Sequence, residues 1–117
     1  CHDISEGGLL STLAEITFGG RGQIRTGIQV DLNIVPGKDL TATQKLFTET
    51  GGFVFEVDPQ LLPAVQRHAS ERGLELNLIG VVRSDEQFII KQGVEDYITL
   101  TVGALADAWL NGLRSKL

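Results

Sequence analysis

Residues 2–18 read HDISEGGLLSTLAEITF, and this stretch decides how the beginning of the chain folds. Its apolar residues recur at spacings of three and four, which places them on one face of a helix. Ser11, Thr12 and Glu15 fall largely outside that face, and a glycine-rich stretch then ends the pattern. We therefore predict an amphipathic helix over residues 5–18 whose apolar face packs on a core: Leu9, Leu10, Leu13 and Ile16.

The rest of the chain alternates between strand-like and helix-like segments. Thr41 and Gln44 form a capping-box pattern, and Asp58 followed by Pro59 is typical of another helix start. Ser84-Asp85 suggests a hairpin tip. The order α-β-α-β-α-β-β-β-α indicates an α+β fold, with mixed α/β layers and helices covering a mixed sheet. The predicted strands span 24–32, 53–57 (buried), 74–82, 88–90 and 97–102; the later helices span 42–50, 59–73 (apolar face Leu61, Leu62, Val65 and Ala69) and 104–116.

The composition is that of one globular domain. Of the 117 residues, 42% are hydrophobic and 21% are charged, which excludes disordered and fibrous classes. Ten basic and fifteen acidic residues give a net charge of −5, which argues against nucleic acid as a partner held by charge. No apolar run approaches the roughly 20 residues of a membrane span, so no membrane partner is expected. One cysteine, Cys1, fits a reducing, cytoplasmic setting.

The first eight residues carry the chemistry. His2, Asp3, Ser5 and the pair Gly7-Gly8 stand at the start of a helix, with no lead-in strand expected before it. The first N–H groups of a helix are unpaired and its dipole makes that end positive, so a phosphate can approach over glycines. An aspartate is a hard oxygen ligand suited to Mg²⁺. The alternative is a simple helix cap without a ligand.

These residues also carry a resemblance. His2 to Leu9 is similar to the His-Asp-x-Ser-Asp/Glu-Gly-Gly-Leu signature of phosphoribosylformylglycinamidine synthase, an amidine-forming enzyme of purine biosynthesis. Residues 13–18, 46–57 and 73–90 resemble later blocks of that family in the same order. The sequence departs from the family after the first helix: Gly19-Gly20 stands where the family has Ala-Gly, and the stretch Arg21–Arg25 does not align.

The resemblance implies a function and a site. The chain looks like the second C-terminal domain of the aminoimidazole ribonucleotide (AIR) synthetase type, also called PurM-like. Asp3 matches a magnesium ligand of the family and Ser5 a nucleotide contact. From the residues themselves, Gly7 and Gly8 are expected to let a phosphate approach the backbone, and His2 either contacts phosphate, positions Asp3, or is only a packed or solvent-facing residue. The implied cofactors are ATP or ADP and Mg²⁺. No residue of this domain is expected to be catalytic by itself.

The implied partners are the other domains of the same synthetase chain and a glutamine amidotransferase domain or subunit; a homodimer is left open. The chain has no methionine and begins at Cys1, so we expect residues 1–117 to be a single domain of a longer protein that cannot run the reaction alone.

Two alternatives stay open. One is a domain of another PurM-like ATP-dependent enzyme, such as selenophosphate synthetase, thiamine-phosphate kinase or a hydrogenase maturation factor. The other is a non-catalytic regulatory or dimerisation module. Elsewhere in the chain, His68 is expected on the surface, and Trp109 in the core or at an interdomain contact.

Overall fold

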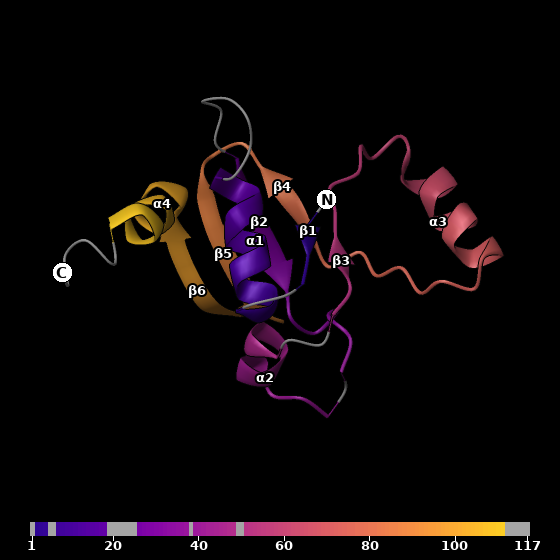
Figure 1. Ribbon diagram of the computed structural model, residues 1–117, viewed down its shortest axis with the longest axis horizontal. Coiled ribbons are helices and arrows are strands. Elements are labelled where there is room, and N and C mark those ends of the chain that lie inside the picture. Colours follow the sequence, from indigo (N-terminus) through magenta and orange to yellow (C-terminus); the bar gives the residue numbers. More distant parts are fainter. Residues whose placement is uncertain (1, 5–6, 19–25, 38, 49–50, 112–117) are drawn as a thin grey trace.

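The fold is organised around a mixed four-stranded sheet. A computed structural model of the chain describes residues 2–4, 7–18, 26–37, 39–48 and 51–111. The strands are β2 (Gly27–Asp31), β4 (Gly80–Arg83), β5 (Gln87–Gln92) and β6 (Glu95–Thr101), in the order β4-β2-β5-β6. Strand β2 is parallel to β5 and antiparallel to β4, while β5 and β6 are antiparallel. This mixed sheet with helices confirms the predicted α+β class (Figure 1).

The core lies between this sheet and helix α1 (Gly8–Phe18), which lies against the face of the sheet in Figure 1. Helix α2 (Ala42–Phe47) packs at one end of α1, and helix α4 (Val102–Asn111) packs beside it. Side chains from alternate positions of β2 and β5 point to the helix, as the period of two requires. The core residues are Leu9, Leu13, Ile28, Val30, Leu32, Ala42, Leu46, Phe88 and Ile90.

Helix α1 forms largely as predicted but starts later. It begins at Gly8, whereas the prediction began it at residue 5; Gly7, directly before it, has a φ of 82°, outside the right-handed helical region. Thr12 is buried, against the prediction that it lies outside the packed face. The glycines expected to end the helix and the stretch Arg21–Arg25 lie outside the described residues.

A small second sheet carries the first residues of the chain, so the expectation of no lead-in strand is wrong. Strand β1 (His2–Asp3) pairs antiparallel with β3 (Phe53–Val54), with His2 opposite Val54 and Asp3 opposite Phe53. The predicted buried strand 53–57 is therefore shorter, and it is not buried: the side chain of Phe53 is 72% exposed. The reason is that β3 lies outside the four-stranded sheet and pairs with β1 in a separate two-stranded sheet.

Strands β4 and β5 do not form the predicted hairpin. Strand β2 lies between them in the sheet, so Ser84-Asp85 connects two strands that are not neighbours. Glycines allow the close backbone approach of β2 to both sides. A Cβ atom on Gly27 would lie 2.2 Å from the carbonyl oxygen of Gln87, and one on Gly80 would lie 2.2 Å from that of Gln29. Local turn residues therefore set the bend, while sheet pairing over long range sets the partners.

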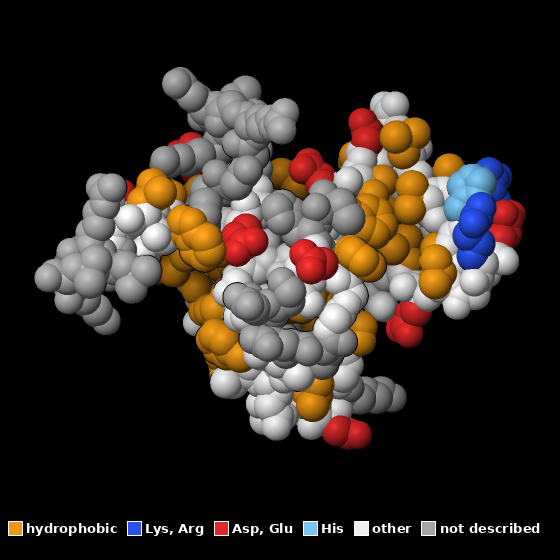
Figure 2. Space-filling view, viewed as in Figure 1, with side chains coloured by type: hydrophobic (Ala, Val, Ile, Leu, Met, Phe, Trp, Pro, Cys, Tyr) orange, Lys and Arg blue, Asp and Glu red, His pale blue; other side chains and the backbone are white. Residues whose placement is uncertain are grey.

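Helix α3 (Leu62–Glu71) stands away from the rest of the molecule. Asp58 caps a turn before the helix instead of the helix itself: its Oδ1 accepts a hydrogen bond from the Gln60 N–H at 2.8 Å. None of the α3 residues is buried. Figure 2 shows apolar side chains between α3 and the body of the molecule, and charged ones at the far end of the helix.

Several predicted elements also begin or end at other residues than expected. Helix α2 ends at Phe47 rather than near residue 50, although its predicted capping box of Thr41 and Gln44 is present. Of the predicted strand 74–82 only residues 80–82 lie in a strand, which continues to Arg83, and α4 begins at Val102 rather than at Ala104. The part of the last helix predicted beyond residue 111 lies outside the described residues. Each boundary depends on tertiary pairing that a local pattern does not encode.

An exposed ion pair fixes the bend after β4. The Nε of Arg83 donates to Oδ1 of Asp85 at 2.9 Å, and its Nη1 donates to the side-chain oxygen of Gln29 on β2 at 2.8 Å. The hydrogen bond from Arg83 is the main reason that the pKa of Asp85 falls from 3.8 to about 2. The bend is thereby tied to the neighbouring strand.

The core position of Phe88 gives a stability prediction. Phe88 is fully buried, so Phe88→Ala should lower the free energy of unfolding by about 3–5 kcal/mol through lost burial and the cavity left behind. Phe53→Ala makes the same change at an exposed site and should cost less than about 1 kcal/mol in the domain 1–117. Urea unfolding monitored by circular dichroism measures both. Equal losses for the two variants would contradict the assignment of the core.

The ion pair gives a pH prediction. The folded-state pKa of Asp85, about 2, lies below its ordinary value of 3.8. The carboxylate therefore stabilises the fold above its unfolded pKa, and that contribution is lost as pH falls from about 4 toward 2. In Asp85→Asn the free energy of unfolding should fall less steeply with acid over this interval than in the wild type, as urea unfolding at a series of pH values would measure. Asp107→Asn, at an exposed site on α4, should keep the wild-type slope. An unchanged slope in Asp85→Asn would rule out this role.

Candidate functional site

The candidate site is the connection from β1 to α1, where the sequence motif lies. Asp3 is exposed at the end of β1, and its backbone pairs with Phe53 of β3. The next N–H along the chain, that of Ile4, donates to the carbonyl oxygen of Gly52 at 2.9 Å. The exposed carboxylate is thus carried by a strand end whose backbone is held on one side by β3.

Helix α1 holds the same strand end from the other side. The Oγ1 of Thr12 lies 3.2 Å from the carbonyl oxygen of Asp3 and 3.1 Å from that of Gly8. Thr12 is 3% exposed, so this contact is shielded from water. The turn between Asp3 and α1 is therefore closed by a side chain from the second turn of the helix.

The two glycines of the motif have different surroundings. Gly7 is exposed, and a Cβ atom there would lie 2.2 Å from Oγ of Ser11. Gly8 is buried, and a Cβ atom there would lie 2.8 Å from the backbone carbonyl oxygen of Leu46 at the end of α2. A side chain would disturb both positions, and the left-handed φ of each adds strain for any other residue. Gly8 therefore serves close packing of α1 on α2, a use that the sequence analysis did not anticipate.

The predicted site residues are only partly described. Asp3, Gly7 and Gly8 lie together around the start of α1. The backbone of His2 lies in β1, while the surroundings of its side chain are not among the described features. Ser5 lies outside the described residues. Positive electrostatic potential from the helix N-terminus is the feature that would favour an anion here.

The donor set for a metal is small. Among the described residues, no group of three or more histidine, cysteine, aspartate or glutamate side chains is placed to hold a metal ion. Asp3 supplies hard carboxylate oxygens at an exposed position, so it could fill one coordination position of a Mg²⁺ ion. Mg²⁺ also keeps several waters and uses phosphate oxygens, so a single protein carboxylate is compatible with such a site. The described residues thus fit a shared site rather than a complete metal centre.

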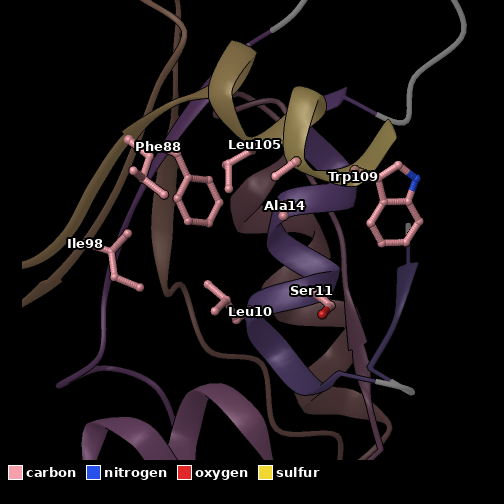
Figure 3. Close-up of a pocket in the computed structure, with 9 residues that line it drawn as sticks. Leu10, Ser11, Ala14, Phe88, Ile98, Leu105 and Trp109 are labelled. Atoms are coloured by element: carbon pink, nitrogen blue, oxygen red, sulfur yellow. The ribbon is translucent and has the colours of Figure 1, made fainter. Parts of the chain in front are cut away.

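Helix α1 also borders an apolar pocket, away from the candidate site (Figure 3). It measures about 310 Å³ and lies between α1, α4 and the strands β5 and β6. Its lining is apolar except for Ser11, and Trp109 borders it while remaining 61% exposed. Trp109 is therefore not a core residue, and whether it forms an interdomain contact stays a prediction. The lining residues are Leu10, Ser11, Ala14, Phe88, Ile98, Leu100, Leu105, Ala108 and Trp109.

Two further observations concern the exposure of His68 and the length of the helices. His68 on α3 is exposed, as predicted, and its Nδ1 lies 3.9 Å from a carboxylate oxygen of Glu71. Each helix within the described residues falls short of the length and apolar character needed to cross a membrane.

Comparison with known proteins places this geometry in a family. Residues 1–92 match the family described as "AIR synthase related protein, C-terminal domain". A curated relative is "Probable membrane antigen 75" of Saimiriine herpesvirus 2 (strain 11), 32% identical over 110 residues. The match covers 94% of this chain and 8% of that protein.

Solved structures show the same fold. "T. maritima PurL complexed with ADP" matches with a TM-score of 0.73 and 22% identity over 90% of this chain. "Structure of PurLQS from Thermotoga maritima" matches with a TM-score of 0.72 and 21% identity over 90% of this chain. The chain spans 18% of each of those chains. The family match over residues 1–92 confirms the resemblance to the AIR synthetase type, and the chain belongs to the family of AIR synthase related C-terminal domains.

Proposed function

We propose that the chain is a domain of an ATP-dependent synthetase and forms one wall of a magnesium–nucleotide phosphate site. The observation that carries this proposal is the exposed carboxylate of Asp3, held at a strand end beside the N-terminus of α1. A carboxylate and a positive helix end at the same place suit a metal-bound phosphate, because one binds the cation and the other the anion. The family match and the PurL fold support the same reading.

Each residue has a limited part in this proposal. Asp3 would hold Mg²⁺ as one ligand among several. The exposed backbone at Gly7 would face a phosphate, while Gly8 would keep the helix start close to α2. His2 and Ser5 enter through the motif, which resembles the family signature at both positions. The domain thus positions and neutralises charge, which is most of what phosphoryl transfer needs from protein.

The finer proposal is the reaction of phosphoribosylformylglycinamidine synthase. In that reaction ATP would transfer a phosphoryl group to the formamide oxygen of formylglycinamide ribonucleotide and leave as ADP. Ammonia, released from glutamine by an amidotransferase domain or subunit, would then displace this oxygen as inorganic phosphate and leave the amidine. The motif at residues 2–9 and the likeness in fold to PurL structures with ADP and with ATP support this choice. Residues 1–117 would act as a single cytoplasmic domain, and other domains would bring the remaining metal ligands.

A second candidate function is a non-catalytic structural module that keeps the fold. One observation favours it: large apolar side chains are exposed around β3 and α3, with Phe53 72% and Leu74 64% exposed. Under this reading the exposed apolar side chains near β3 and α3 would serve contacts with neighbouring protein, and Asp3 would have no ligand.

The first candidate predicts a metal-dependent loss in one variant. In the intact protein, Asp3→Asn should weaken Mg²⁺–ADP binding by about ten-fold or more, because removing even an indirect partner of a metal typically costs that much. Asp107→Asn, at an exposed site on α4, should bind as the wild type does. Isothermal titration calorimetry with Mg²⁺ and ADP measures all three proteins.

Each outcome separates the two candidates. Wild-type binding that Asp3→Asn leaves intact would remove Asp3 from the metal site. Absence of Mg²⁺–ADP binding in the intact wild-type protein would reject the synthetase proposal and favour the structural module. The expected pattern, a loss in Asp3→Asn alone, would support the nucleotide site.

A further inference from the structure

A buried threonine connects the helix to the proposed metal ligand. Thr12 lies in the second turn of α1 and is 3% exposed. A buried hydroxyl is costly unless it makes a hydrogen bond. Within a helix, a threonine meets this need by donating to the carbonyl oxygen four residues earlier, and here that is Gly8 at 3.1 Å. The local helix therefore already provides an acceptor for Thr12.

The second contact of Thr12 goes beyond this local need. Its Oγ1 also lies 3.2 Å from the carbonyl oxygen of Asp3, nine residues earlier and in a different element. A hydroxyl has one hydrogen, so the two carbonyl oxygens share it or take it in turn. The contact closes the turn between β1 and α1 at the residue whose carboxylate is exposed.

The backbone of Asp3 is thereby fixed from two directions. Strand β3 holds it through the pairing of Asp3 with Phe53 and the bond from Ile4 to Gly52 at 2.9 Å. Thr12 holds it from the helix side. A metal-ligating residue whose backbone is already ordered loses less conformational entropy when the metal binds. The smaller entropy cost raises the affinity for the metal.

We propose that Thr12 is a positioning residue that orients Asp3 for Mg²⁺, an inference that rests on the proposed magnesium–nucleotide site. Thr12 touches neither metal nor nucleotide in this role. It acts through the Asp3 backbone, so its loss should change the metal-dependent part of binding. The part of ADP affinity that does not need Mg²⁺ should stay the same.

Helix α1 offers a matched control. Thr17 is also 3% exposed, and its hydroxyl donates to the carbonyl oxygen of Ala14 at 2.6 Å. Both residues of this hydrogen bond lie in α1. Within the described part of the chain, the Thr17 side chain therefore makes no hydrogen bond to β1. Valine has nearly the shape of threonine without the hydroxyl. Thr12→Val and Thr17→Val thus remove the same group from one helix, and only the first loosens Asp3.

The test is Mg²⁺–ADP binding in the intact protein, measured by calorimetry with and without Mg²⁺. Thr12→Val should weaken Mg²⁺–ADP binding by roughly five-fold, which is what one lost hydrogen bond is typically worth. Its affinity for ADP without Mg²⁺ should not change. Thr12→Ser keeps the hydroxyl and should restore wild-type binding, and Thr17→Val should bind as the wild type does. Thermal unfolding of each variant shows that it is folded.

Two outcomes would overturn the inference while leaving the proposed function in place. One is that Thr12→Val binds Mg²⁺–ADP as Thr17→Val does, although Asp3→Asn loses binding. The other is an equal loss in Thr12→Val with and without Mg²⁺, which is the mark of a purely structural role. If Asp3→Asn itself keeps full Mg²⁺–ADP affinity, Asp3 is not a ligand of the metal and the role of Thr12 fails with it. If the wild type binds no Mg²⁺–ADP, the proposed function fails.

Discussion

The packing of α1 on the central strands is the contact on which the rest of the structure depends. Leu9 and Leu13 meet the inward side chains of β2 and β5, and the resulting core is fully shielded at Phe88 and Ile90. Burial of apolar surface is the main favourable term in folding, and this is where most of it is concentrated. Helices α2 and α4 pack against α1. Because the motif of residues 2–8 leads directly into this helix, the candidate site is attached to the element that packs on the core.

That anchoring also explains why the surroundings of Asp3 include residues with no chemistry of their own. Gly8 is buried against the end of α2, where any side chain would strike the backbone of Leu46. Thr12 joins the helix to the end of β1. These two positions do not need to touch a ligand to matter, because they decide where Asp3 stands relative to the helix end. The backbone that carries the exposed carboxylate of Asp3 is thus held by β3 on one side and by Thr12 on the other.

The part of the chain around α3 has the opposite character. No residue of α3 is buried, and Phe53, Phe55, Leu74 and Leu78 are exposed around the segments that flank it. An amphipathic helix with an uncovered apolar side is more typical of a domain that meets other protein surfaces than of an isolated one. The chain spans 18% of PurL and 8% of the viral relative. Both proposed functions, the synthetase domain and the structural module, would place neighbouring protein over this surface.

The sequence by itself determined the α+β class, the apolar face of α1 at Leu9 and Leu13, the capping box of α2 and the grouping of Asp3 with Gly7 and Gly8, because these depend on residues close in the chain. It did not determine that β2 separates β4 from β5, that β1 pairs with β3, or that Thr12 reaches Asp3. Those contacts join residues with no local signal between them. Only the tertiary structure decided them, because strand partners and buried hydrogen bonds are chosen by how whole elements pack around the core.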